Sequence, residues 1–183
     1  MQKSGLVYAF ETDTVWGLGA DINDSLGIKK IYELKKREQA KPLILMSSSF
    51  ENIEKYLEPL NDEAKNLVEK YMPGALTIIV KKSDKFPKYL NPEFDTVGVR
   101  IPNHSGFMEF CKKNSDMVLA TTSANISGEK PLENSKEIKE KFGKNVEILK
   151  DTELKLNKNT PSTIVLVEEN SLKVLRQGDI QIN

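Results

Sequence analysis

Residues 117–128 read MVLATTSANISG, and this stretch decides the fold. The first part, Met117–Ala120, is an apolar run with the length and composition of a buried strand. Small residues with hydroxyl or amide side chains then dominate Thr121–Gly128, which predicts a loop that starts where the strand ends. Because ligands gather at strand ends in α/β sheets, the stretch indicates a sheet and a candidate anion-binding loop. An elaborate N-cap with an Asx turn is the alternative reading of the same side chains.

Short apolar runs alternate with helical patterns on both sides of this stretch. Further strands are predicted over Leu6–Phe10, Leu43–Met46, Ala75–Lys82, Thr96–Ile101, Val146–Lys150, Ser162–Val167 and Leu172–Arg176. Helices are predicted over Ser25–Lys36, Phe50–Leu57, Asn61–Met72, Ser105–Asn114 and Ser135–Phe142. Loops are predicted over Glu11–Ala20, Pro87–Pro92 and Leu154–Asn159. The alternation predicts an α/β fold with helices flanking one sheet, and short turns between neighbouring strands indicate a mixed sheet.

Length and charge place further bounds on the protein. A chain of 183 residues is of single-domain size, so residues 1–183 are expected to form one domain. Its 27 basic and 27 acidic residues give a net charge of 0, so global charge does not draw it to nucleic acid or anionic membranes. The longest apolar run, 75–80, is far shorter than a membrane span. With no signal peptide visible in Met1–Gly5, we expect a cytoplasmic protein without membrane contact.

The chain has one cysteine, Cys111, and one histidine, His104. These counts exclude an internal disulfide, a cysteine-rich zinc site and a multi-histidine metal site. Cys111 falls on the inner face of its predicted helix and His104 at the helix start, so both are expected to be structural. Chemistry in this chain is therefore expected to come mostly from hydroxyls, amides, cations and backbone groups.

Arginine is rare here, since Arg37, Arg100 and Arg176 are the only arginines among 27 basic residues. Arginine binds carboxylates and phosphates in a bidentate way that lysine cannot match. Arg100 lies in an otherwise apolar strand, where it needs either a buried salt bridge or a ligand carboxylate. Arg37 belongs to the cluster Lys35–Arg37, which either suits the end of a helix or binds polyphosphate. The hydroxyls and spaced glycines of Thr12–Gly19 fit either a tight turn or a close backbone approach to a ligand.

Taken in order, these motifs resemble the YrdC-like family of threonylcarbamoyl-AMP synthases, over Leu6 to Ile180. The matching segments are Glu11–Gly19, Lys35–Arg37 with Lys41–Ile44, Pro73–Thr77, Thr96–Pro102, Ser123–Gly128, Ser162–Val165 and Leu175–Gly178. The chain departs from the family pattern at Glu11 (Pro), Asp13 (Glu), Trp16 (Tyr), Glu38 (Pro) and Met46 (His).

The resemblance implies a twisted mixed sheet with a concave basic groove. It also implies an enzyme that converts L-threonine, bicarbonate or CO2, and ATP into threonylcarbamoyl-AMP and pyrophosphate. This product feeds the formation of threonylcarbamoyl-adenosine in tRNA, so threonylcarbamoyl-transfer machinery acting on tRNA is the implied partner. Mg²⁺ would arrive with ATP, and no protein-bound metal cage is expected.

The resemblance also implies roles for individual residues. The implied catalytic residues are Lys35, Arg37, Ser123 and Asn125. The implied ATP-binding residues are Arg37, Lys41, Thr96, Ser123 and Arg176. The implied threonine-binding residues are Thr14, Met46, Arg100, Thr121 and Ser162, with Arg100 as the partner of the carboxylate.

Two other functions share parts of this pattern. A non-catalytic module of the same fold would bind double-stranded RNA or tRNA in the groove, although the balanced charge argues against it. A carbamoyl-transferring relative in hydrogenase maturation is larger and has cysteine-rich zinc segments, and one cysteine argues against that.

Overall fold

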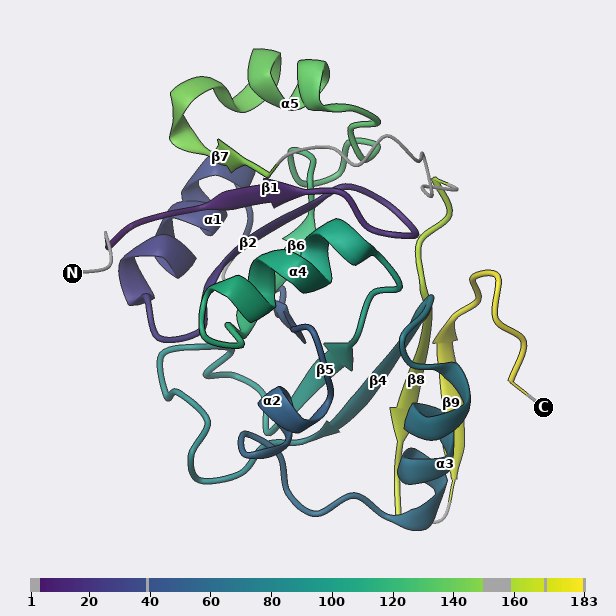
Figure 1. The fold of residues 1–183 in the computed structure, drawn as a ribbon. Helices are drawn as coiled ribbons and strands as arrows, with labels where there is room; N and C mark the ends of the chain where they lie inside the picture. Colours follow the sequence, from purple (N-terminus) through teal and green to yellow (C-terminus); the bar gives the residue numbers. More distant parts are fainter. Residues whose placement is uncertain (1–3, 39, 150–158, 170, 183) are drawn as a thin grey trace.

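The computed structural model describes residues 4–38, 40–149, 159–169 and 171–182 (Figure 1). Over these residues the helices are α1 (Ser25–Lys35), α2 (Glu51–Glu54), α3 (Asp62–Tyr71), α4 (Ser105–Lys113), α5 (Ser135–Phe142) and a 3-10 turn, η1 (Gly143–Asn145). The strands are β1 (Tyr8–Phe10), β2 (Gly17–Asp21), β3 (Ile44–Met46), β4 (Leu76–Lys81), β5 (Thr96–Arg100), β6 (Leu119–Ser123), β7 (Glu147–Ile148), β8 (Thr163–Val167) and β9 (Leu172–Arg176). None of the described helices has the length and apolar character required to cross a membrane.

The strands form one sheet in the order β7-β1-β2-β6-β3-β5-β4-β8-β9. The pairs β1–β7, β3–β5 and β4–β8 are parallel, and the other neighbouring strands are antiparallel. The predicted α/β class with a mixed sheet and flanking helices is therefore confirmed.

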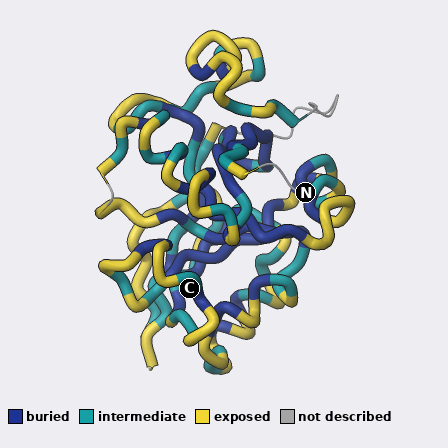
Figure 2. Tube along the Cα trace, turned by 90° about the vertical axis from the view of Figure 1, so that its left-hand side faces the viewer, coloured by how far each residue is buried: buried dark blue, intermediate teal, exposed yellow. Residues whose placement is uncertain are grey.

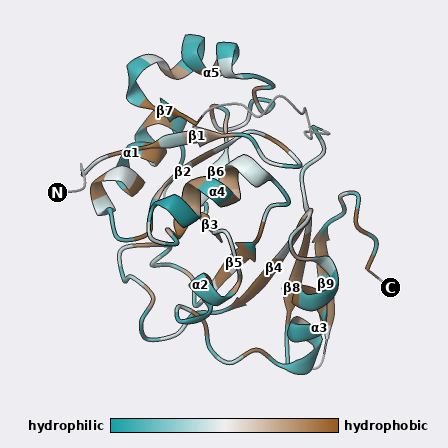
Figure 3. Cartoon of the chain, viewed as in Figure 1, coloured by the Kyte–Doolittle hydropathy of each residue, from teal (hydrophilic) through white to brown (hydrophobic). Residues whose placement is uncertain are grey.

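Strand β1 shows how the layers form, because successive side chains on a strand point to opposite faces. Phe10 meets Phe107 of α4, with 4.8 Å between the ring centroids. Ala9 belongs to the larger core cluster, which also holds Ile31 of α1. Helices α1 and α4 thus lie on opposite faces of this part of the sheet (Figure 1). The buried, apolar strands run through the middle of the molecule, and polar helix faces surround them (Figures 2 and 3).

Strand β2 contradicts the predicted loop over Glu11–Ala20, because Gly17–Asp21 is a strand. Its glycines serve close packing rather than a turn. A Cβ on Gly17 would lie 2.6 Å from Cε2 of Phe10, and one on Gly19 would lie 3.0 Å from Cε1 of the same ring. The aromatic ring of β1 therefore fits across β2 only because these two positions lack side chains.

Strand β6 also runs further than predicted, since it continues to Ser123. Its polar half pairs with the glycine-rich strand, with Thr121 opposite Gly19 and Ser123 opposite Gly17. The predicted loop over Thr121–Gly128 therefore begins three residues later. Helix α2 is shorter than the predicted Phe50–Leu57, and most of the predicted loop Leu154–Asn159 lies outside the described residues.

Helix α4 confirms the structural roles expected for His104 and Cys111. His104 is the N-cap, and its Nδ1 accepts a hydrogen bond from the Phe107 backbone N–H at 3.2 Å. Cys111 is fully buried in the cluster that contains Phe10 and Phe107. Burial, with a smaller contribution from the charge of Asp116, raises the pKa of the Cys111 thiol to about 12.

We predict that the Cys111 thiol is unreactive in the folded chain, because the reactive thiolate is both scarce and covered. At pH 8, reaction with an aromatic disulfide should be roughly 1,000-fold slower in the native protein than in guanidinium chloride. The unfolded chain, which should release one equivalent of chromophore, is the control. Equal rates in the two states would contradict the packing of α4.

Candidate functional site

A cavity of about 750 Å³ opens on the face of the sheet formed by parts of β3, β4, β5, β6, β8 and β9. All but one of the residues implicated by the sequence line it. These are Thr14, Arg37, Lys41, Met46, Thr96, Arg100, Thr121, Ser123, Asn125, Ser162 and Arg176. The fold therefore gathers residues that are far apart in the sequence around one space, and their individual roles stay predictions.

Arg37 and Lys41 supply positive charge on one wall, just after α1. The Nε of Arg37 donates to the Lys41 carbonyl at 3.2 Å, and its Nη2 donates to the Pro42 carbonyl at 3.0 Å. These two bonds hold the guanidinium in place and leave three of its five N–H groups for a ligand. Burial lowers the pKa of Arg37, but an arginine stays charged at neutral pH.

Arg100 supplies another, deeply buried cation among the residues that line the cavity. Its Nη2 forms a salt bridge with the Asp13 carboxylate, its Nη1 donates to Thr14 Oγ1 at 2.6 Å, and its Nε donates to the Gly74 carbonyl at 3.0 Å. Burial lowers the pKa of Arg100, and Asp13 opposes that shift. Of the two alternatives left open by the sequence, the buried salt bridge is present, and Arg100 also faces the cavity.

The hydroxyl of Thr14 is oriented by its neighbours. Thr12 Oγ1 donates its only proton to the Val15 carbonyl at 2.7 Å, so in its 3.1 Å contact with Thr14 it is the acceptor. Thr14 Oγ1 therefore donates to Thr12 and accepts from Arg100. What Thr14 offers a ligand is a lone pair, which suits an amine or hydroxyl donor.

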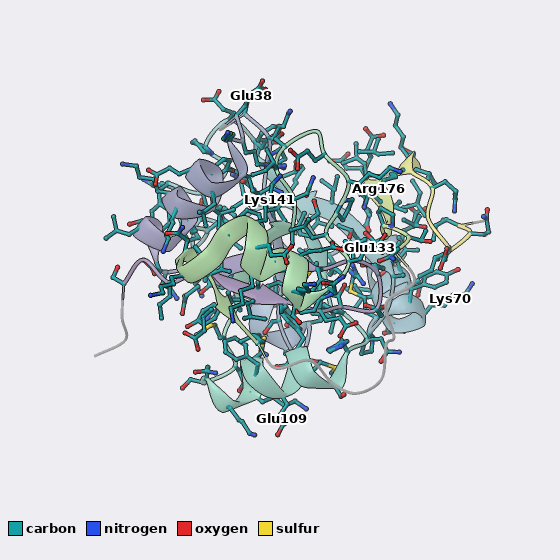
Figure 4. The ribbon with its side chains drawn as sticks, turned by 90° about the horizontal axis from the view of Figure 1, so that it is seen from above. Glu38, Lys70, Glu109, Glu133, Lys141 and Arg176 are labelled. Carbon is teal, nitrogen blue, oxygen red and sulfur yellow. The ribbon has the colours of Figure 1, made fainter. Side chains whose placement is uncertain are left out.

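Arg176 lies at the end of β9 and is labelled in Figure 4. Its charge lowers the pKa of Arg100 further. Its Nε donates to the Ser162 carbonyl at 2.9 Å and its Nη2 to Ser162 Oγ at 3.2 Å. Ser162 Oγ in turn lies 2.8 Å from Thr77 Oγ1. Burial lowers the pKa of Arg176. This hydroxyl pair, with both arginines nearby, forms a donor-rich end of the cavity.

Two functional neighbours were missed by sequence reasoning. Asp13 was quoted as part of a motif but not as the partner of Arg100. Thr77, a cavity residue, was quoted as part of an apolar strand and of a family motif but was not given a role in the site. The available signals were an acid beside Thr14 in a chain with a buried arginine, and a hydroxyl in an otherwise aliphatic strand.

Asp13 and Glu129, two carboxylates at or next to the cavity lining, are already paired. Asp13 binds Arg100, and Glu129 binds Lys141 of α5 at 2.8 Å, a residue visible in Figure 4. Across the described residues there is no cluster of three or more His, Cys, Asp or Glu side chains that could hold a metal ion.

Lys35 departs from the expectation that it faces a phosphate, because it does not line the cavity. As the last residue of α1 it is buried to 1% exposure. Its Nζ donates to the Ser123 carbonyl, to the Asn125 carbonyl at 2.7 Å and to Asn125 Oδ1 at 2.9 Å. Burial, with the charge of Arg37, lowers the pKa of Lys35 to about 7, and the three oxygen acceptors oppose that shift.

The cavity is lined by hydroxyls and by the cationic side chains of Arg37, Lys41, Arg100 and Arg176, a lining that suits an anionic ligand. The model of the Sua5/YciO/YrdC family, whose description is "Telomere recombination", matches residues 1–178. The chain belongs to this family, as its resemblance to YrdC-like proteins predicted.

Similar proteins match this sequence over most of its length. The threonylcarbamoyl-AMP synthase of Vibrio campbellii is 32% identical over 178 residues, which cover 96% of this chain and 94% of that protein. The threonylcarbamoyl-AMP synthase of Pyrococcus abyssi is 33% identical over 181 residues, 98% of this chain. The chain spans about half of the P. abyssi protein, 52% of its length.

Solved structures agree with the fold. The crystal structure of P. abyssi Sua5 complexed with L-threonine superposes with a TM-score of 0.85 at 34% identity, over 95% of this chain and 51% of that one. Escherichia coli YciO superposes with a TM-score of 0.83 at 22% identity, over 96% of this chain and 84% of that one, which shows the shared fold.

We predict that Arg100→Met lowers the free energy of unfolding by about 2–4 kcal/mol, because Asp13 and the Gly74 carbonyl lose their partner. Adding Asp13→Asn should recover part of this loss, giving a coupling of at least about 1 kcal/mol in a double-mutant cycle measured by denaturant unfolding. Arg176→Met is the matched control, because Arg176 lines the same cavity and its described hydrogen bonds go to Ser162 rather than to an acid. Strict additivity of the two substitutions would contradict the pairing.

Proposed function

We propose that the protein is a threonylcarbamoyl-AMP synthase, a nucleotidyltransferase that acts on L-threonine, bicarbonate or CO2, and ATP. Its product would supply the transfer machinery that forms threonylcarbamoyl-adenosine in tRNA. One observation carries the proposal: a single cavity, in a chain of this family, is lined by four cationic side chains, Arg37, Lys41, Arg100 and Arg176. Two separate anionic substrates need cations for both, close together.

The threonine end would be formed by Thr14, Met46, Arg100, Thr121 and Ser162. Arg100 uses three of its five N–H groups within the protein, which leaves two for a carboxylate. Thr14 would accept a hydrogen bond from the amine or the hydroxyl of the amino acid, because its own proton is given to Thr12. These two contacts would orient L-threonine by both ends of its backbone.

The ATP end would be formed by Arg37, Lys41, Thr96, Ser123 and Arg176. Arg37 and Lys41 would contact the phosphates, which carry the charge that free guanidinium and ammonium groups bind best. Mg²⁺ would be held mainly by phosphate oxygens, since the nearby carboxylates of Asp13 and Glu129 are paired with cations. Bound in this way, it would neutralise phosphate charge.

The proposed reaction proceeds in two steps. The amine of threonine adds to CO2 and loses a proton, which gives a carbamate. An oxygen of the carbamate then attacks the α-phosphate, and the bond to the pyrophosphate leaving group breaks. The residues of the chain would hold both reactants together and stabilise the negative charge that builds up on phosphate, with Arg37 as the principal cation.

Pyrophosphate release from ATP, with bicarbonate and Mg²⁺, tests this proposal directly. We expect release to depend on L-threonine, to fall at least tenfold when L-serine replaces it, and to yield a product with the mass of threonylcarbamoyl-AMP. A lack of threonine dependence would overturn it. Tight binding of double-stranded RNA that weakens with salt would then favour the binding-module alternative.

We predict that Arg37→Ala reduces threonine-dependent pyrophosphate release by at least 100-fold, because a cation on the phosphates is lost. The substitution removes only the bonds to the Lys41 and Pro42 carbonyls, so the fold should persist by circular dichroism. Lys29→Ala, which removes an exposed cation from helix α1 and outside the cavity lining, should keep wild-type turnover. Normal turnover in Arg37→Ala would remove this residue from the site.

A further inference from the structure

The loop after β6 is held by hydrogen bonds that involve three side chains and the backbone. We name Lys35, Ser123 and Asn125 the Lys35 network. All three were implicated in phosphate chemistry by the sequence, yet their contacts are directed at one another and at the backbone.

The ammonium group of Lys35 has three protons, and three oxygens accept them. The acceptors are the Ser123 and Asn125 carbonyls and Asn125 Oδ1. With the side chain buried and outside the cavity lining, no proton of this group is left to point at a ligand.

The side chain of Asn125 is equally occupied. Its Oδ1 accepts from Lys35 Nζ and from Ser123 Oγ, the latter at 2.6 Å. Its Nδ2 donates to the Ile126 carbonyl at 3.0 Å and to the Glu129 carbonyl at 2.7 Å. An asparagine amide has two lone pairs and two N–H groups, so all four are used. Because Ser123 gives its proton to Asn125, it offers a ligand lone pairs only.

The backbone of the loop is clamped at the same place. The Ser127 N–H donates to the Lys35 carbonyl at 2.8 Å, so the last residue of α1 holds the loop through its backbone as well as its side chain. The Ala124 N–H donates to the Trp16 carbonyl at 2.7 Å. These contacts fix the loop against α1 and the start of β2.

We propose that the Lys35 network positions the loop beside the phosphates and does not itself donate to them. The phosphate donors are then Arg37 and Lys41, with Ser123 contributing acceptor lone pairs only. Lys35 and Asn125 are positioning residues in this scheme, which for its phosphate part rests on the proposed function. Phosphate oxygens need donors, and Arg37 keeps three N–H groups free of the bonds that hold it.

The first test needs no ligand and is independent of the proposed activity. Hydrogen–deuterium exchange of the amides in 123–129 should be at least tenfold faster in Lys35→Met than in the wild type, with α3 and α4 unchanged. Lys29→Met is the matched control, because it removes an exposed lysine from the same helix. Unchanged protection of the loop in Lys35→Met would overturn the proposal.

The second test separates positioning from direct contact with the nucleotide. In Lys35→Met the KM for ATP should rise at least fivefold, whereas the KM for L-threonine should change less than twofold. A general loss of folded protein would instead lower kcat and leave both KM values alone, which would count against the network. The ionic-strength dependence of ATP binding should stay at the wild-type slope in Lys35→Met and fall in Arg37→Ala. A reduced slope in Lys35→Met would make Lys35 a phosphate ligand and overturn the proposal.

If Lys35→Met does not fold, Ser123→Ala provides the same test with a smaller change. It removes one bond to Asn125 Oδ1 and leaves the others in place. Exchange in 123–129 should then rise two- to fivefold, and loop protection equal to that of the wild type would overturn the proposal.

Discussion

The buried positive charge of Arg100 is the constraint on which the cavity depends. A charge taken out of water costs several kcal/mol unless hydrogen bonds and a counter-charge surround it. Three groups from two parts of the chain meet this need: Asp13 and Thr14 in the loop after β1, and the carbonyl of Gly74 before β4. Each of these segments lines the cavity or lies next to residues that do. The contacts that stabilise the buried guanidinium therefore also shape the site.

Lys35 is a second buried cation whose charge must be stabilised by its neighbours. Its ammonium group donates to three oxygens of the 123–125 segment rather than to a carboxylate. The two buried cations therefore differ in use. Arg100 lines the cavity. Lys35 is buried outside the cavity lining and supports the loop that contains Ser123 and Asn125.

Periodicity and motif order predicted most of the fold, since helices such as α3 and strands such as β4 follow from local apolar patterns. Strand β2 was not predicted, because Gly17 and Gly19 are typical of turns. Only the structure shows that Phe10 packs across both glycines. In the site, motif order brought together residues that line one cavity. It could not indicate on which side of the loop Lys35 lies, nor that Asp13 pairs with Arg100, because both depend on contacts between distant segments.

The hydrogen bonds of Arg100 and Lys35 join distant parts of the chain, and this affects the rate of folding. Thr14 and Arg100 are 86 positions apart in the chain, and Lys35 and Asn125 are 90 positions apart. Closing a loop of such length costs about 4 kcal/mol of chain entropy before any contact compensates for it. Topologies dominated by such closures fold slowly. We therefore expect these contacts to form late in folding, and because Arg176 of β9 also lines the cavity, the complete lining requires synthesis to reach β9.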